Sequence, residues 1–367
     1  MKGYKSENIR NVALVGHGGS GKTTFLEAAL LATGVISRLG KVEDGNTVSD
    51  YDKMEIEKGY SISTSIVPVE YNNVKINFVD TPGFFDFVGE VNSALRAVEA
   101  AAILVDASAG IQVGTEKAWN SCKEFGIPKF FLINKTDKDN VDVDKVIADL
   151  KDKFGTSVVT LDDKEAMTEA IAETDEVLME KFFSGEEFTD DEFNHGLSHG
   201  IGSGDIVPVL ACSSVKGDGI TDVLDDFIKF VPTHAEHEDY DAKNDADEDI
   251  KIKVDPAGKP AAFVFKTIAD PFLGKISLAK VISGTLKSGQ EIYNARAQKS
   301  EKLGSMFFMR GKNQVEAPVV EAGDIVAIAK LQFTKTGDTL CEKANIVKFP
   351  PVKFPAPALY IAIEPKD

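Results

Sequence analysis

The chain has 367 residues, 43% of them hydrophobic, and a formal net charge of −18. That length allows two domains with separate cores, and the negative charge argues against a broad basic surface, so we expect no sequence-specific DNA partner. No run approaches the ~18 apolar residues of a membrane-spanning helix, residues 1–10 lack a signal peptide's apolar segment, and the three cysteines are widely spaced. We therefore expect a cytoplasmic protein with buried free thiols and no membrane partner, and we expect it to be monomeric.

The first predicted element is a strand at residues 11–15, which runs into a glycine-rich loop and then a helix at residues 24–31. The loop fits the pattern G-x-x-x-x-G-K-[ST], in which the glycines let consecutive N–H groups turn toward one anion and the helix N-terminus adds its dipole. Lys22 can supply a charge to the terminal phosphates, and the Thr23 hydroxyl can ligate Mg²⁺. The predicted phosphate-binding residues are Gly16, His17, Gly18, Gly19, Ser20, Gly21, Lys22, Thr23 and Thr24.

Polar residues follow three more predicted strands, at residues 74–79, 129–133 and 205–211. Each group lies where a strand gives way to a loop, the edge at which an open parallel sheet binds its ligand. Singly, these residues could be ordinary helix caps or turn residues; together and in this order they indicate one nucleotide site. The three groups are Asp80, Thr81, Pro82 and Gly83; Asn134, Lys135 and Asp137; and Ser213, Ser214 and Val215.

The second and third of these groups predict selection of guanine. A guanine ring presents N1–H and its 2-amino group as adjacent donors, and the Asp137 carboxylate can accept from both. Asn134 can meet the O6/N7 edge, the Lys135 stem can lie over the ring, and the Ser214 N–H can reach O6. Adenine has no such donor pair, so the predicted ligands are GTP and GDP with Mg²⁺.

From residue 8 to about 233, predicted strands alternate with helices, which indicates a mostly parallel sheet with helices on both faces. Together with the nucleotide motifs, this predicts an α/β P-loop GTPase domain. Residues 143–154 have helical spacing, and residues 165–181 are predicted as one helix. After residue 259, short β-rich pieces separated by glycine turns predict an all-β barrel. The expected domains are 1–234, an acidic linker at 235–256 and the barrel at 257–348; the family resemblance described next implies a shortened insert at about 155–205 and the start of a further, truncated domain at 349–367.

The chain resembles the translational GTPases, and most closely the elongation factor G family. The resemblance rests on E-K-G-Y-S-I at 57–62, D-T-P-G-F-F-D-F at 80–87, V-D-A-S-A-G at 105–110 and T-G-D-T-L-C at 336–341. It covers nearly the whole chain, including the translation-factor barrel. The family's third to fifth domains are absent, so we expect a fragment of a longer protein. The resemblance implies Mg²⁺ held by Thr23 and Ser61, with Asp80 acting through water, and a ribosome partner.

The sequence departs from the family pattern at three positions. The family's aspartate in the phosphate loop is Gly19, its switch threonine is Ser61, and its histidine after D-T-P-G is Phe84. Ser61 keeps a hydroxyl, whereas a phenyl ring has no group to hold the attacking water. We therefore expect weak hydrolysis. The resemblance assigns catalytic roles to Lys22 and Gly83 and to the position of Phe84, and His17 could place the water or only shape the loop.

The resemblance implies a GTP/GDP switch that acts on the ribosome in a translocation-type step. Alternatives are a ribosome-protection or release-type GTPase, and a GTP-gated binding module with little hydrolysis. A P-loop kinase or ATPase is a further reading, which would bind ATP as well as GTP. The guanine-selective groups disfavour it.

Overall fold

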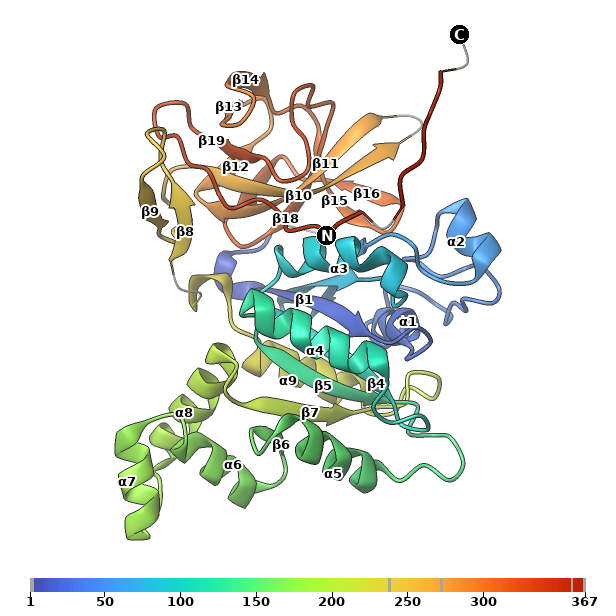
Figure 1. The fold of residues 1–367 in the computed structure, drawn as a ribbon, viewed down its shortest axis with the longest axis vertical. Coiled ribbons are helices and arrows are strands. Elements are labelled where there is room, and N and C mark those ends of the chain that lie inside the picture. The colour runs from blue at the N-terminus through green and yellow to red at the C-terminus, as the bar shows by residue number, and fades with distance from the viewer. Residues whose placement is uncertain (1–2, 237–238, 271–272, 358, 366–367) are drawn as a thin grey trace.

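The chain folds into an α/β part and an antiparallel β part that lie one above the other (Figure 1). The structure is a computed structural model and describes residues 3–236, 239–270, 273–357 and 359–365. Residues 237 and 238 of the predicted linker, and residues 358, 366 and 367 of the predicted further domain, lie outside these ranges.

The α/β part is built on a seven-stranded sheet in the order β2-β3-β1-β4-β5-β7-β6. Neighbouring strands run parallel, except that β2 pairs antiparallel with β3 at one edge. The predicted mostly parallel sheet is therefore confirmed. Its strands are β1 (Ile9–Gly16), β2 (Ser65–Tyr71), β3 (Val74–Asp80), β4 (Ala100–Asp106), β5 (Lys129–Asn134), β6 (Val158–Thr160) and β7 (Val207–Ala211).

Helices cover both faces of this sheet (Figure 1). One core cluster joins the sheet to α1 (Lys22–Ala32), α6 (Lys164–Ala172), α8 (Asp190–Ser203) and α9 (Ile220–Phe230). The other cluster joins it to α3 (Val88–Leu95), α4 (Val113–Phe125) and α5 (Val143–Phe154). The α5 bounds match the helix predicted from the spacing of apolar residues. The remaining short elements are α2 (Lys53–Lys58), α7 (Glu176–Ser184), and the 3-10 helices η1 (Ser6–Asn8), η2 (Phe85–Phe87) and η3 (His234–Glu236).

Within the insert, two helices, α6 and α7, occupy the segment where the sequence predicts one. The prediction of a continuous helix over residues 165–181 is wrong, because α6 ends at Ala172 and α7 begins at Glu176. Asp175 lies between them in an extended conformation and accepts hydrogen bonds from the N–H groups of Val177 and Leu178 at 2.8 and 3.0 Å. Such a cap satisfies the free N–H groups that start a new helix.

The β part is antiparallel throughout its main sheet, whose eight strands have the order β14-β13-β19-β10-β11-β18-β15-β16, with β12 and β17 forming a separate pair. Strands of both sheets contribute to one apolar core. We call this part the β domain. Its strands are β10 (Ala261–Asp270), β11 (Gly274–Ser283), β12 (Thr285–Lys287), β13 (Glu291–Asn294), β14 (Lys299–Lys302), β15 (Met306–Arg310), β16 (Asn313–Glu316), β17 (Val319–Glu321), β18 (Ile325–Ala329) and β19 (Thr339–Cys341).

The acidic segment predicted as a linker contains a short antiparallel hairpin, β8 (Tyr240–Lys243) with β9 (Asp249–Ile252). Its exposed acids are paired across the two strands: Lys243 with Asp249 at 2.8 Å and Lys251 with Asp241 at 2.7 Å. Alternating charge of opposite sign explains why a polar segment forms strands here. Among the described residues after 348, none lies in a helix or strand.

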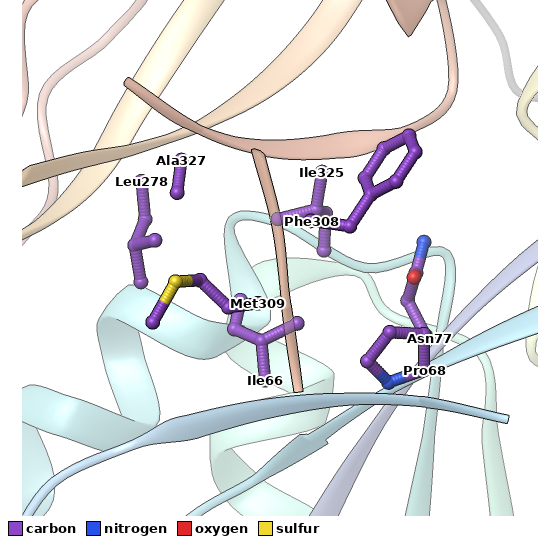
Figure 2. Close-up of a pocket in the computed structure, with 8 residues that line it drawn as sticks. All are labelled: Ile66, Pro68, Asn77, Leu278, Phe308, Met309, Ile325 and Ala327. Carbon is purple, nitrogen blue, oxygen red and sulfur yellow. The ribbon is translucent and has the colours of Figure 1, made fainter. Parts of the chain in front are cut away.

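An apolar seam joins the two parts. Figure 2 shows Ile66 and Pro68 of β2 facing Met309 and other side chains of the β domain. The space that these side chains enclose has no room for a water molecule. Next to the seam, the Gly311 N–H donates to the Ile66 carbonyl at 3.0 Å. A Cβ at Gly311 would lie 1.9 Å from the Val48 carbonyl oxygen, so only glycine permits this approach.

A buried ionic network lies beside the seam and crosses between the two parts. Glu99 of the α/β part pairs with Lys280 of the β domain at 2.7 Å and with His234 at 2.9 Å. In the same interface Lys75 pairs with Asp324 at 2.8 Å. All of these side chains are buried, so the two parts are held by charges that water does not screen.

Candidate nucleotide site

The predicted binding residues gather at the carboxyl edge of the sheet because β1, β3, β5 and β7 all end there. A cleft of about 520 Å³ opens at this edge. Of the residues predicted from sequence, Gly18, Gly19, Gly21, Lys22, Thr23, Thr24, Ser61, Gly83, Phe84, Lys135 and Val215 line it. The cleft is also lined by Gly59 and Tyr60 of the E-K-G-Y-S-I motif. Further lining residues were not identified from the sequence: Leu39, Gly40, Lys41, Val42, Glu43, Asp50 and Lys138.

The phosphate loop has the backbone that its glycines were expected to provide. Gly21 has φ of 96° and leads into α1, and a Cβ there would lie 2.3 Å from the Asn134 amide nitrogen. The buried Lys22 Nζ donates to the carbonyls of Gly16 and His17 at 3.2 and 3.1 Å. Burial lowers the pKa of Lys22 to about 8, although the charges of Asp80 and Asp50 oppose the shift. The ammonium is therefore still mostly charged at pH 7.

The residues expected to hold a divalent cation lie together beneath the loop. Thr23 Oγ1 donates to Asp80 Oδ2 at 2.9 Å and lies 3.4 Å from Ser61 Oγ. Ser49, which the sequence did not single out, also donates to Asp80 Oδ2 at 2.8 Å. Within the described residues, Asp80 Oδ1 and Asp50 Oδ2 are buried oxygens without a hydrogen-bond partner. Two hydroxyls beside two unpartnered carboxylate oxygens fit a hard cation such as Mg²⁺.

The two carboxylates repel each other and carry raised pKa values. Burial raises the pKa of Asp80. Burial and the charge of Asp80 raise the pKa of Asp50 to about 7, while a hydrogen bond from Ser61 opposes that shift. Asp50 was missed because it lies in an irregular segment 30 residues before Asp80, and no motif spacing links the two.

The raised pKa of Asp50 predicts how the stability of the metal-free protein depends on pH. The folded state binds the Asp50 proton more tightly than the unfolded chain, whose pKa is near 3.8, so stability falls as pH rises from about 4 to 7. We expect Asp50→Asn to raise the melting temperature in EDTA by about 2–4 °C at pH 8 and to flatten its fall between pH 5 and 8. Asp44→Asn, an exposed residue of the same segment, is the matched control. An unchanged pH profile in Asp50→Asn would contradict the assignment.

On the base side of the cleft, Asn134 joins three segments. Its Oδ1 accepts from the backbone N–H of Lys135 at 2.8 Å and from the N–H and hydroxyl of Ser214 at 3.1 and 2.8 Å. Its Nδ2 donates to the carbonyls of Ser20 and Gly21 at 3.2 and 3.4 Å. Asn134 therefore fixes the phosphate loop against the loop after β7, a role that the sequence did not predict.

Lys135 and Asp137 are also positioned by neighbours. Lys135 has φ of 67°, and its Nζ lies 2.6 Å from both the Gly19 carbonyl and Asp106 Oδ2. Burial alone would raise the pKa of Asp106, but hydrogen bonds from Lys135 and Ser108 bring it to about 2. Asp137 Oδ1 accepts from Ser213 Oγ at 2.5 Å, which orients one carboxylate oxygen. Asp106 thus anchors the Lys135 stem at the edge of the cleft.

Two buried glutamates hold the segment that leads from α1 to β2, and sequence reasoning missed both. Glu27 accepts from the N–H groups of Gly40 and Val48 at 3.0 and 2.6 Å. Glu55 accepts from the N–H groups of Ile62 and Ser63, each at 3.0 Å. The capping box formed by Asp52 and Glu55 was visible in the sequence as D-x-x-E, whereas Glu27 offered no local signal.

Phe84, which occupies the position of the family histidine, packs against the phosphate loop. Its ring packs on Tyr60 with centroids 4.7 Å apart, and it lies over Gly18, since a Cβ there would be 3.4 Å from Phe84 Cζ. Gly83 approaches the loop closely, because its Cβ would lie 2.6 Å from Lys22 Nζ. His17 Nδ1 accepts from the Gly114 N–H of α4 at 3.3 Å. This contact favours a role for His17 in shaping the loop.

Two predicted residues support the site from beneath. Both the N–H and the hydroxyl of Thr81 donate to the Leu14 carbonyl, at 3.3 and 2.6 Å. Pro82 lines a separate apolar cavity of about 100 Å³ between the Gly83–Phe85 turn and α4. Thr81 and Pro82 therefore fix the turn that presents Gly83 to the cleft.

Comparison with known proteins relates both parts to translation factors. Residues 7–233 match the family described as elongation factor Tu GTP binding domain, and residues 259–343 match elongation factor G domain 2. The chain is 30% identical to elongation factor G of Neorickettsia sennetsu (strain ATCC VR-367 / Miyayama), over 98% of this chain and 59% of that protein. A crystal structure of a protein from Thermus thermophilus superposes with a TM-score of 0.79 at 29% identity, over 92% of this chain and 54% of that one.

The chain thus spans a little over half the length of these relatives. Among the described residues, no helix combines the length and apolar character needed to cross a lipid bilayer.

Proposed function

Because this chain belongs to the elongation factor Tu GTP-binding domain family and is a translational GTPase of the elongation factor G type, we propose that it acts on the ribosome as a GTP/GDP switch. In this proposal, the γ-phosphate is held by Lys22 and the Gly83 N–H. Its loss frees the segments around residues 40–62 and 83–90, which we call switch I and switch II.

The main support for the proposal is one cleft of about 520 Å³. The phosphate loop, both switches and Lys135 all line it. Asp137 is not among the lining residues, but it lies in the chain between Lys135 and Lys138, which are, and Ser213 orients one of its oxygens. In the proposal its carboxylate accepts from two adjacent donors of guanine. The Ser214 N–H, which was expected to reach O6, donates to Asn134 Oδ1 at 3.1 Å, and this bond holds the loop that would meet the base. Preorganisation of this kind favours affinity.

Mg²⁺ is part of the same proposal. Thr23 and Ser61 would ligate it directly, and Asp80 and Asp50 would act through their unpartnered oxygens. The ion would neutralise phosphate charge and, at the same time, relieve the repulsion between the two carboxylates.

A test of nucleotide choice separates this proposal from a P-loop kinase or ATPase. We expect GTP and GDP to displace a labelled guanine nucleotide. ATP should not displace it even at about 100-fold higher concentration. Ribosomes should then retain the protein in sedimentation with a non-hydrolysable GTP analogue and release it with GDP. Equal competition by ATP would contradict guanine selection, and retention independent of the nucleotide would contradict the switch.

Hydrolysis by the isolated protein should be slow. Phe84 gives the attacking water no hydrogen-bonding group, and its ring lies against Tyr60 over the phosphate loop. The protein would then need a ribosomal group to place the water, or would use GTP as an allosteric ligand and hydrolyse little. A GTP-gated binding module is the second candidate that this aromatic pair favours.

Restoring a polar group at residue 84 tests this reading. We expect Phe84→His to raise the single-turnover rate of GTP hydrolysis about 10- to 100-fold, because an imidazole can orient water. Phe85→His is the matched control, since Phe85 is a comparably exposed neighbour that lies against His17 and Lys117. Equal and fast hydrolysis by the parent and Phe84→His would show that the phenyl ring is no impediment.

The ribosomal step is proposed as translocation, by likeness to elongation factor G. A ribosome-protection or release-type GTPase would share both parts of the chain. A translocation assay run beside an assay for release of a ribosome-bound ligand distinguishes the two. We also propose that the protein is monomeric and cytoplasmic.

A further inference from the structure

Lys266 of the β domain is presented to the α/β part by a β-bulge. Strand β10 pairs with β11 so that Val264 lies opposite Ala279, and the register shifts by one residue before Lys266, which lies opposite Leu278. Val264 and Ala279 face the core of the β domain, whereas Leu278 belongs to the cluster shared with the α/β part. Without the bulge, the alternation of a strand would turn Lys266 into the β-domain core.

The buried ammonium of Lys266 contacts switch II and the two residues that follow switch I in the chain. Its Nζ donates to Ser63 Oγ and, at 2.8 Å, to the Thr64 carbonyl oxygen, both just beyond switch I. It also donates to Glu90 Oε2 at 2.6 Å, on the switch II helix α3. These three acceptors match the three donors of an ammonium group.

The backbone just after switch I also contacts switch II at this point. Thr64 N–H donates to Glu90 Oε2 at 2.6 Å, and the Thr64 hydroxyl donates to the Glu90 carbonyl at 3.2 Å. Ser63 follows Ser61 by two residues, and the Ser63 N–H is held by the buried Glu55. A short, restrained piece of backbone therefore connects Lys266 with the Ser61 hydroxyl, which lies 3.4 Å from Thr23.

The charge of Lys266 makes this arrangement sensitive to switch movement. Burial lowers the pKa of Lys266, and the Glu90 carboxylate opposes that shift. For Glu90, burial would raise the pKa, but Lys266 and Thr64 bring it below its usual value. A buried ammonium that loses one of its acceptors is strongly disfavoured. A movement of Thr64 or Glu90 away from Lys266 would therefore be energetically unfavourable.

We propose that Lys266 is a positioning residue supplied by the β domain, which favours the arrangement in which switch I and switch II close on a triphosphate. It raises the preference of the protein for GTP over GDP and links the position of the β domain to the nucleotide. This inference rests on the proposed GTP/GDP switch and adds that the β domain takes part in nucleotide selection.

The test compares binding of GDP and of guanosine 5′-(β,γ-imido)triphosphate by calorimetry in the parent and in Lys266→Met. We expect the analogue to bind about tenfold more weakly in the variant and GDP to change less than about twofold. Lys275→Met is the matched control, because Lys275 lies on the neighbouring strand β11 and its Nζ donates to the Gln332 and Thr334 carbonyls of the β domain. This control should leave both affinities unchanged.

A second variant guards against general loss of structure. Glu90→Gln keeps the size of the side chain but removes the charge that faces Lys266. It should lower the ratio of analogue to GDP affinity, and the double variant should add little to either single change, because both remove one interaction. Limited proteolysis of residues 39–64 gives an independent readout. The analogue should protect this segment in the parent and in Lys275→Met, and protect it less in Lys266→Met.

The outcomes separate the two proposals. If the parent does not distinguish the analogue from GDP in affinity or in proteolysis, the switch itself is contradicted. If the parent distinguishes them and Lys266→Met keeps the same affinity ratio and protection, the role of Lys266 is overturned. Additive effects of Lys266→Met and Glu90→Gln on that ratio would equally overturn it.

Discussion

Replacing Asp137 by asparagine is expected to change the base preference of this protein from guanine to xanthine. An amide presents one acceptor and one donor, so it no longer accepts from both N1–H and the 2-amino group of guanine, whereas its NH₂ can donate to the 2-oxo group of xanthine. A binding site that forms hydrogen bonds with a polar group of its ligand strongly rejects ligands that leave the site's own polar group without a partner. We expect GTP affinity to fall about 100-fold or more, and xanthosine triphosphate to bind measurably.

Competition binding with GTP, xanthosine triphosphate and ATP measures this change. Asp139→Asn is the matched control, because Asp139 is an exposed carboxylate two residues further along the same loop. The asparagine at residue 137 can still accept from Ser213, which at present donates to Asp137 Oδ1. Retention of the parent's GTP affinity would remove Asp137 from the base site and with it the main argument for guanine selection.

Removing Glu99 is expected to destabilise the contact between the two parts of the protein. Glu99 Oε1 faces both Lys280 and His234, and its Oε2 accepts from Asn11 at 2.6 Å. Glu99→Ala leaves a buried ammonium without its carboxylate, which typically costs about 3–5 kcal/mol. The free energy of unfolding can be followed in urea through the fluorescence of Trp119, the single tryptophan of the chain. Trp119 packs on Phe131 in the α/β part.

The control and the pH dependence sharpen this prediction. Asp249→Ala breaks the exposed pair with Lys243, and it should change stability by less than about 1 kcal/mol. Burial alone would raise the pKa of Glu99, but Lys280 and His234 lower it from 4.5 to about 2. The stability that Glu99 contributes is therefore present above its unfolded pKa and is lost as pH falls from about 4.5 to 2. Equal effects of the two variants would contradict a structural role for the buried network.

The sequence alone specified the fold class and the main parts of the nucleotide site. Strand, glycine loop and helix follow each other within residues 9–32, so local spacing fixed the phosphate loop. The parallel sheet then brought Asp80, Asn134 and Ser214 to the same edge, because each follows or ends a strand. The break between α6 and α7 lies at the capping residue Asp175, a residue type whose side chain bonds the first N–H groups of a new helix.

Only the tertiary structure decided how these parts are held. Asp50 and Glu27 act on residues across irregular segments, and Lys266 meets Glu90 from 176 residues away. No periodicity in the chain encodes such contacts, because they depend on how two separately folded parts pack and on a bulge that changes which face Lys266 occupies. Local backbone preferences thus determined which residues could bind a nucleotide. Which other residues hold these binding residues in place was determined by the burial of charged side chains between the two parts. Buried charges interact strongly because packing keeps water from screening them.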